Sequence, residues 1–217
     1  MADPDSPEPK FRRRAEHRPD ELLDAALALF VEKGYSHTSV AEIARKAGVS
    51  KGALYLYFPS KQAVLEGLVR RAVSPIAIRA QEAIDIADAD LRATLRALLT
   101  VIATALGDPK VFAVPKIVIR EAVVAPEIAE MYRRAVFDNV LPAGAAIIRR
   151  AVAQGKIRPV DPEMTLRSLV GPVIMHLLLS EIFGIEPEGG LALDRLVENH
   201  LDILVNGLFP ATESHDA

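Results

Sequence analysis

The apolar residues of this chain repeat with the 3.6-residue period of an α-helix from about residue 20 to about residue 208. Asp20 can cap the first helix, because its side chain can accept a hydrogen bond from the backbone of the first turn. Gly34 is placed to end that helix in a left-handed conformation. Strand-like alternation of apolar and polar residues is not sustained in any segment. The pattern therefore predicts an all-α fold.

Start and stop signals divide the next part of the chain into three short helices. Serines that can cap a helix precede each of them: Ser39, Ser50 and Ser60. Glu42 follows Ser39 by three residues, which is the spacing of a capping box. Gly48 ends the first of these helices, and Pro59 ends the second because proline lacks an N–H and disfavours helical geometry in the residue before it. We expect the third to run to about residue 75.

Turns rich in Gly and Pro separate the remaining helices. Their predicted ranges are 76–106, 110–124, 126–154, 163–184 and 191–208. Pro142 and Pro172 fall inside two of these ranges and are expected to kink them. The domain organisation that follows is a disordered basic arm at 1–18, a domain of short helices at 19–66, a bundle of long helices at 67–210 and a tail at 211–217.

The net charge of −3 hides a basic first third. Residues 10–71 hold twelve Lys or Arg and seven Asp or Glu, a local charge of +5, whereas residues 72–217 have a charge of −5. A basic end on an acidic remainder indicates a polyanion partner at that end, although scattered solvated charge gives the same numbers. The cluster Arg12–Arg14 fits either a solubility tail or an arm in a minor groove of DNA.

The sequence contains no residue pattern typical of an enzyme active site. Cysteine is absent, which excludes disulfides and thiolate metal sites and fits a reducing cytoplasm. The five histidines have no metal-ligand spacing, and the chain has neither a phosphate loop nor a Gly-rich dinucleotide turn. The polar start of the chain is not a secretory leader, and the uncharged stretch 168–180 is shorter than the roughly 18 residues of a membrane span. We expect a cytoplasmic protein that is not an enzyme and holds no metal or cofactor.

Residues 38–58 have the pattern of a helix-turn-helix, two short helices joined by a turn that contains Gly48. In the second helix, about Lys51 to Tyr57, Leu54 falls on the inner face. Gly52, Ala53 and Leu56 fall on the outer face. An exposed glycine in a helix costs about 1 kcal/mol relative to alanine, so small outer residues make sense if DNA must approach closely. The pattern predicts that this helix enters the major groove.

The stretch TSVAEIARKAGVSKGALYLYFPSK at residues 38–61 resembles the DNA-binding signature of the TetR/AcrR family of bacterial transcriptional regulators. The preceding helix, 22–34, is similar too, so the resemblance covers about 50 residues. It implies a three-helix DNA-binding domain followed by a helical domain for effector binding and dimerisation. The positions that the resemblance assigns to phosphate contacts are Thr38, Ser39, Tyr55, Tyr57 and Lys61. Those it assigns to base contacts are Lys51, Gly52 and Ala53.

Specific binding needs two such heads, because dimers reach two half-sites on the duplex. Apolar stripes on the last two predicted helices are the candidate interface, as the resemblance also implies. They consist of Leu166, Leu169, Val173, Leu177, Leu193, Val197, Leu201, Leu204 and Leu208. The same side chains would equally suit a core within one chain.

The resemblance also implies an effector pocket among the middle helices. Met and Phe side chains suit an adaptable apolar site, and the candidate lining is Phe112, Ile117, Met131, Phe137, Met175 and His176. A lone histidine on an apolar helix also fits a core position. The function expected is a ligand-responsive repressor that binds a palindromic operator as a homodimer and is released by a small, largely apolar effector. The alternative is a DNA-binding dimer without an effector.

Overall fold

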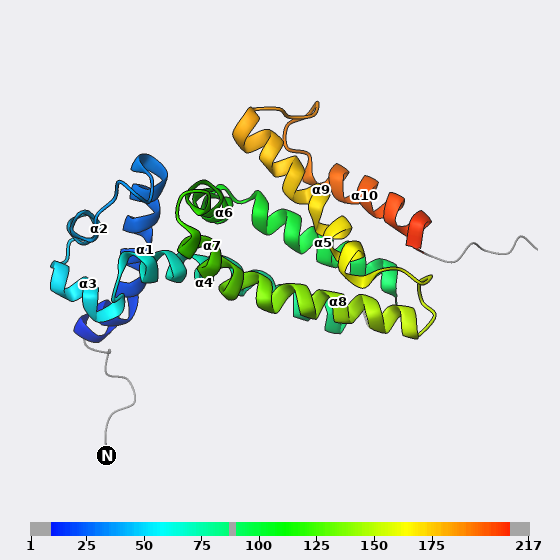
Figure 1. Cartoon of the computed structure of the whole chain (residues 1–217), viewed down its shortest axis with the longest axis horizontal. Helices are drawn as coiled ribbons and strands as arrows, with labels where there is room; N and C mark the ends of the chain where they lie inside the picture. Colours follow the sequence, from blue (N-terminus) through cyan, green and yellow to red (C-terminus); the bar gives the residue numbers. More distant parts are fainter. Residues whose placement is uncertain (1–9, 87–89, 209–217) are drawn as a thin grey trace, which may run out of the picture. The chain divides into compact units, whose positions relative to one another are not determined.

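The computed structural model describes residues 10–86 and 90–208, and these residues form helices joined by turns with no strand among them (Figure 1). The predicted all-α fold is confirmed. The elements are α1 (Lys10–Lys33), α2 (Val40–Lys46), α3 (Lys51–Tyr57), α4 (Lys61–Ile86), α5 (Leu91–Gly107), α6 (Pro109–Ala122), α7 (Pro126–Tyr132), a π-helical turn (Arg133–Phe137), α8 (Asp138–Ala153), α9 (Pro162–Phe183) and α10 (Leu193–Leu208).

The chain packs as two units. The head consists of residues 10–71 and 113–132, and the body of residues 72–86, 90–112 and 133–208. Helices α4 and α6 each have one part in the head and one part in the body. The segment 113–132, which was predicted to belong to the second domain at 67–210, packs with the head.

The core of the head is built on the inner stripe of α1, which packs against α2. Apolar side chains with no more than 2% of their surface exposed come from α1 to α4 and also from α6 and α7: Leu22, Ala26, Phe30, Ile43, Ala44, Leu54, Val64, Leu65, Leu68, Val69, Val114 and Ile128. Gly67 lets α4 approach closely, since a Cβ there would lie 2.9 Å from the Phe58 ring and 3.0 Å from Leu23. An ion pair of 2.9 Å between Lys33 and Glu42 joins α1 to α2 at the surface.

The core of the body is one apolar cluster formed mainly by α5, α9 and α10, with α8 against α9. Its buried members are Leu95, Leu99, Ala103, Phe112, Ile148, Ala151, Ile157, Leu169, Val173, Leu177, Val197, Leu201 and Leu204. A Cβ at Gly144 of α8 would lie 2.7 Å from a methyl group of Leu166, which shows how closely α8 and α9 approach.

Several predicted boundaries are wrong. Helix α1 begins at Lys10 rather than Asp20, so residues 10–18 of the predicted disordered arm are helical. Their Lys, Arg, Ala and Glu residues favour a helix without forming an apolar stripe, and the search for a period therefore missed them. Helix α4 continues through the exposed Pro75 to Ile86, so this proline costs the helix one hydrogen bond without ending it. The range 126–154 is interrupted by the π-helical turn.

The predicted caps of the short helices are confirmed. The side chain of Ser39 accepts a hydrogen bond from the N–H of Glu42, and the Glu42 carboxylate accepts one from the N–H of Ser39 at 2.9 Å. Ser50 caps α3 by accepting from the N–H of Ala53 at 3.1 Å. These hydrogen bonds satisfy backbone donors that helices of seven residues would otherwise leave unpaired.

The core of the body predicts a large effect for Leu177→Ala. Leu177 is 1% exposed in the cluster, so its truncation removes apolar contacts and leaves a cavity. We expect a loss of about 2–5 kcal/mol in the free energy of unfolding, measured by urea denaturation at fixed protein concentration. Ile78→Ala, at a side chain of the body that is 60% exposed, is the control and should change it little. Equal losses in the two variants would contradict this core.

The capping box predicts an acid-sensitive start of α2. Hydrogen bonds from the Ser39 backbone N–H, from Lys33 and from the Ser39 hydroxyl lower the pKa of Glu42 from 4.5 to about 2. A carboxyl whose pKa is lower in the folded state stabilises that state above pH 4.5, and this stabilisation is lost as the pH falls from 4.5 toward 2. NMR titration should find this lowered pKa, and Lys33→Ala should raise it. A wild-type pKa of 4.5 would refute the capping geometry.

Candidate DNA-binding site

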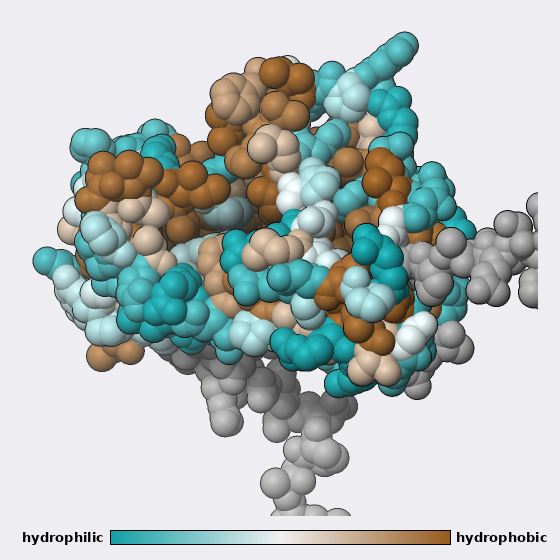
Figure 2. Space-filling view, turned by 45° about the vertical axis from the view of Figure 1, so that its right-hand side comes forward, coloured by the Kyte–Doolittle hydropathy of each residue, from teal (hydrophilic) through white to brown (hydrophobic). Residues whose placement is uncertain are grey.

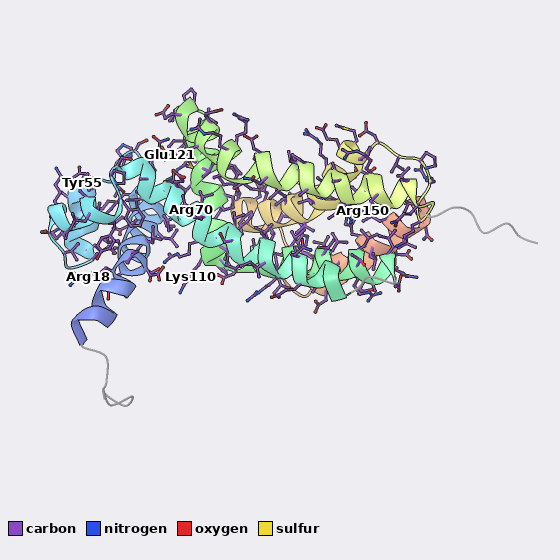
Figure 3. The ribbon with its side chains drawn as sticks, turned by 90° about the horizontal axis from the view of Figure 1, so that it is seen from below. Arg18, Tyr55, Arg70, Lys110, Glu121 and Arg150 are labelled. Carbon is purple, nitrogen blue, oxygen red and sulfur yellow. The ribbon has the colours of Figure 1, made fainter. Side chains whose placement is uncertain are left out.

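Helix α3 buries one side and exposes the other. Leu54 is completely buried in the head, whereas Leu56 is 85% exposed. Tyr55 and Tyr57 lie to the two sides with about two fifths of their surface exposed, and Figure 3 labels Tyr55 among the short helices of the head. The ammonium of Lys51 lies 5.7 Å from the centroid of the Tyr55 ring. The outer surface of α3 therefore combines a cation, two phenols and an apolar side chain.

Gly52 leaves open space on this surface. A Cβ there would meet only the Ser50 hydroxyl, at 3.9 Å, so nothing in the head requires a glycine at this position. The exposed glycine lowers helix stability without a packing reason, which fits close approach by an external partner. Ala53, predicted to lie on the same outer face, is half-buried instead.

Two of the residues that were predicted to contact phosphates form hydrogen bonds within the chain through their hydroxyls. Thr38 is 2% exposed, and its hydroxyl donates to the carbonyl of Gly34 at 2.8 Å. The Thr38 side chain therefore closes the turn after α1 and is not available to a partner, contrary to the prediction. The exposed Ser39 uses its hydroxyl in the capping box, where it donates to the Glu42 carboxylate at 2.9 Å.

Lys61 reaches back to the turn between α1 and α2. Its ammonium donates to the carbonyls of Tyr35 at 2.8 Å and Ser36 at 3.3 Å, and it lies 4.4 Å from the centroid of the Tyr35 ring. Partial burial lowers the pKa of Lys61, and the negative charge of Glu121 acts in the opposite direction. Sequence reasoning missed this role because the partners are 25 and 26 residues away.

The same turn and the end of α1 contact the last residues of α6. The Ser36 hydroxyl donates to the Glu121 carboxylate at 2.5 Å, and the Arg120 guanidinium donates to the carbonyl of Phe30 at 3.3 Å. Burial and the charges of Glu127 and Glu121 raise the pKa of Tyr35. No motif spacing pointed to Glu121, since its partner Ser36 is 85 residues away in sequence.

The predicted dimer-interface residues lie on the inward side of their helices. Leu169, Val173, Leu177, Val197, Leu201 and Leu204 are buried in the body's own core, with Leu166 and Leu193 packed against it. The side chain of Leu208 lies outside the described part of the chain. Side chains buried within one chain are not available to a second copy, so the prediction selected the wrong face. The helical spacing of apolar residues does not tell which stripe faces the core when a helix has apolar residues on both sides.

A second, exposed stripe runs along α9. It is uncharged and follows helical spacing: Met164, Ser168, Gly171, Met175 and Ile182. At the C-terminal end of α9, Ile182, Phe183 and Ile185 are each more than half exposed, and Figure 2 shows apolar side chains at the top, where Figure 1 places this end. Helix α9 is long and apolar enough to span a membrane by length and composition alone. The helix is so apolar because it has a buried apolar stripe and, in addition, an exposed stripe without charges.

The predicted effector-pocket residues do not share one environment. Ile117 and Met131 are buried in the head and Phe112 in the body, whereas Phe137 and Met175 are more than 40% exposed. His176 is half-buried, and its Nε2 atom lies 2.6 Å from the carbonyl oxygen of Leu191, so this ring nitrogen has a partner within the chain. An open groove of about 540 Å³ lies between the start of α9 and the end of α10, and none of the six residues lines it.

Comparisons with known proteins agree with this architecture. The profile of the family described as "Bacterial regulatory proteins, tetR family" matches residues 22–68, and that of the "Tetracyclin repressor-like, C-terminal domain" matches residues 86–188. The transcriptional repressor KstR2 of Rhodococcus jostii is 39% identical over 83 residues, which are 38% of this chain and 40% of that protein. The chain spans less than half the length of the curated relatives that it matches.

Solved structures share the fold over most of the chain. A putative TetR-family regulator from Mesorhizobium loti aligns with a TM-score of 0.73 and 22% identity, over 91% of this chain and 99% of that one. The SmeT–triclosan complex aligns with a TM-score of 0.71 and 25% identity, over 89% and 92% of the two chains. The helix-turn-helix signature, the two matched profiles and these structures together lead to one conclusion. The chain belongs to the TetR family of bacterial transcriptional regulators.

Proposed function

We propose that this protein is a ligand-responsive repressor that binds a palindromic operator as a homodimer and is released by a small, largely apolar effector. The observation that carries the proposal is the outer surface of α3, where Lys51, Gly52 and Leu56 are exposed while Leu54 anchors the helix from beneath. A helix of this kind fits the major groove, where its donors reach phosphates and base edges and its apolar side chain suits a thymine methyl group. Acting on chromosomal DNA, the protein works in the cytoplasm.

The dimer is proposed to form across the exposed faces of α9 and α10. The stripe from Met164 to Ile182 carries no charge, and Ile203 on α10 is 61% exposed. Apolar residues without charge are typical of the centre of a stable interface between subunits. A Cβ added at Gly171 would meet no atom within 4 Å, which leaves room for a partner helix to approach.

The effector is proposed to act through the body. A solved relative of this fold is described as a complex with triclosan, a small and largely apolar molecule. Helices α4 and α6 belong partly to the body and partly to the head, so a change in the body has two continuous helices along which to reach the DNA-binding surface. A ligand must favour the non-binding form by a few kcal/mol to shift the population. If no compound of a broad apolar panel altered operator binding, the alternative of a dimer without an effector would hold.

The proposed DNA contact predicts that Lys51→Ala and Tyr55→Ala weaken binding. The probe is a duplex that the wild-type protein selects from a random library, and the measurement is the dissociation constant over a range of salt concentrations. Lys51→Ala, at a position assigned to base contacts, should weaken binding most on the selected sequence. Tyr55→Ala removes a neutral phosphate contact, so it should weaken binding across sequences with little change in the slope against salt. Lys110→Ala, at an exposed lysine of the body, is the control. Unchanged affinity in both α3 variants would exclude α3 from the contact.

The proposed interface predicts that Ile203→Glu separates the dimer. A charge in an apolar interface must lose its water without gaining a partner, so association becomes unfavourable. Sedimentation velocity should show a dimer for the wild type and a monomer for the variant. Ile78→Glu places the same charge on an exposed side chain of α4 and should leave the dimer intact. A dimer in both variants would place the interface elsewhere.

A further inference from the structure

Glu121, at the C-terminal end of α6, is a charged residue inside the head. It is 5% exposed, and burying a carboxylate is costly unless hydrogen bonds and charges compensate. Its partners are the Ser36 hydroxyl at 2.5 Å and the neighbouring Arg120 guanidinium at 3.3 Å. Figure 3 labels Glu121 on the same unit as Tyr55 of α3. Nothing in the DNA contact proposed above uses this carboxylate.

The segment that Glu121 holds is the turn from Gly34 to Thr38, called here the α1–α2 turn. It is held from three directions. From α6, Glu121 binds Ser36; from α4, Lys61 donates to the carbonyls of Tyr35 and Ser36. From within, the Thr38 hydroxyl donates to the carbonyl of Gly34 at 2.8 Å. Gly34 has φ +90°, and a Cβ there would lie 3.0 Å from the Arg120 guanidinium, so this turn fits closely against α6.

The α1–α2 turn leads directly into the DNA-binding surface. Ser39, which follows it, is the N-cap of α2, and α2 packs against α3. Lys61, whose ammonium rests on the turn, begins α4. Positions 38, 39 and 61 are among the five that the family resemblance assigned to phosphate contacts, although Thr38 and Lys61 hold the turn itself.

We propose that Glu121 is a positioning residue for operator binding, which holds the α1–α2 turn through Ser36 and thereby fixes the start of α2 and the ammonium of Lys61. This inference rests on the proposed function. An apolar residue at position 121 would fill the same space without the desolvation cost of a carboxylate, so stability alone does not explain the choice. Because α6 begins at Pro109 in the body, Glu121 also joins the DNA-binding surface to a helix that continues into the body.

The test uses two gentle substitutions in the full-length protein and the duplex selected by the wild type. Ser36→Ala removes the donor to Glu121, and Glu121→Gln keeps an acceptor but removes its charge. Each should lower affinity about tenfold, the order expected of a hydrogen bond to a charged group. Each should also reduce the salt dependence of binding, while sedimentation and thermal unfolding still show a folded dimer. Lys61→Ala should cost less in Glu121→Gln than in the wild type, because both residues act through one turn.

Glu127→Gln is the matched control. Glu127 is an exposed carboxylate on α7 whose charge also acts on Tyr35, and its loss should leave affinity unchanged. Wild-type affinity and salt dependence in both test variants would overturn the proposal. So would losses that merely follow the fraction of unfolded or dissociated protein.

Hydrogen exchange gives a second measurement that needs no DNA. The amides of residues 35–39 should exchange about tenfold faster in Ser36→Ala and Glu121→Gln than in Glu127→Gln, since the turn opens more often when the Ser36 contact is weakened. Unchanged exchange in the two test variants would overturn the proposed role of Glu121. If the wild type selects no duplex, the proposed function fails, and the exchange rates still decide whether Glu121 holds the turn.

Discussion

The exposure of α3 depends on the burial of Leu54 beneath it. A helix of seven residues is not stable alone in water, and the chain leaves most of α3 uncovered. The helix is kept in place by one buried leucine, by the Ser50 cap at its start and by its packing on α2. The rest of the head, from Phe30 of α1 to Leu65 of α4, forms the core that receives this leucine. The outer residues of α3 therefore do not pack in the core and are accessible to a binding partner.

The head is not independent of the second half of the sequence. Residues 113–132 pack with it, and the last turn of α6 contacts the end of α1 through Arg120 and the turn after α1 through Glu121. Helix α6 therefore contributes both to the apolar body and to a polar contact beside the DNA-binding surface. This arrangement gives the proposed effector response a route to the head, because α6 runs without a break from Pro109 of the body to the Glu121 contact with the turn.

Local signals predicted the head well and the long-range contacts poorly. The capping box of Ser39 with Glu42, the Ser50 cap and the division of α3 into an inner and an outer face depend on residues close in sequence. The roles of Lys61 and Glu121 depend on partners 26 and 85 residues away, at distances that follow no motif. In α9, apolar spacing identified Val173 and Leu177 but could not decide that they face the chain's own core, since Met175 and Ile182 form a second stripe on the same helix.

The central claim is that α3 is displayed for the major groove of DNA in two heads of a dimer. Methylation protection on the selected duplex tests it most directly, because guanine N7 is reached from the major groove and adenine N3 from the minor groove. The account predicts protected guanine N7 atoms in two half-sites related by a palindrome and separated by whole turns of about 10 base pairs. Protection confined to adenine N3, or a single protected site without a symmetric partner, would contradict it.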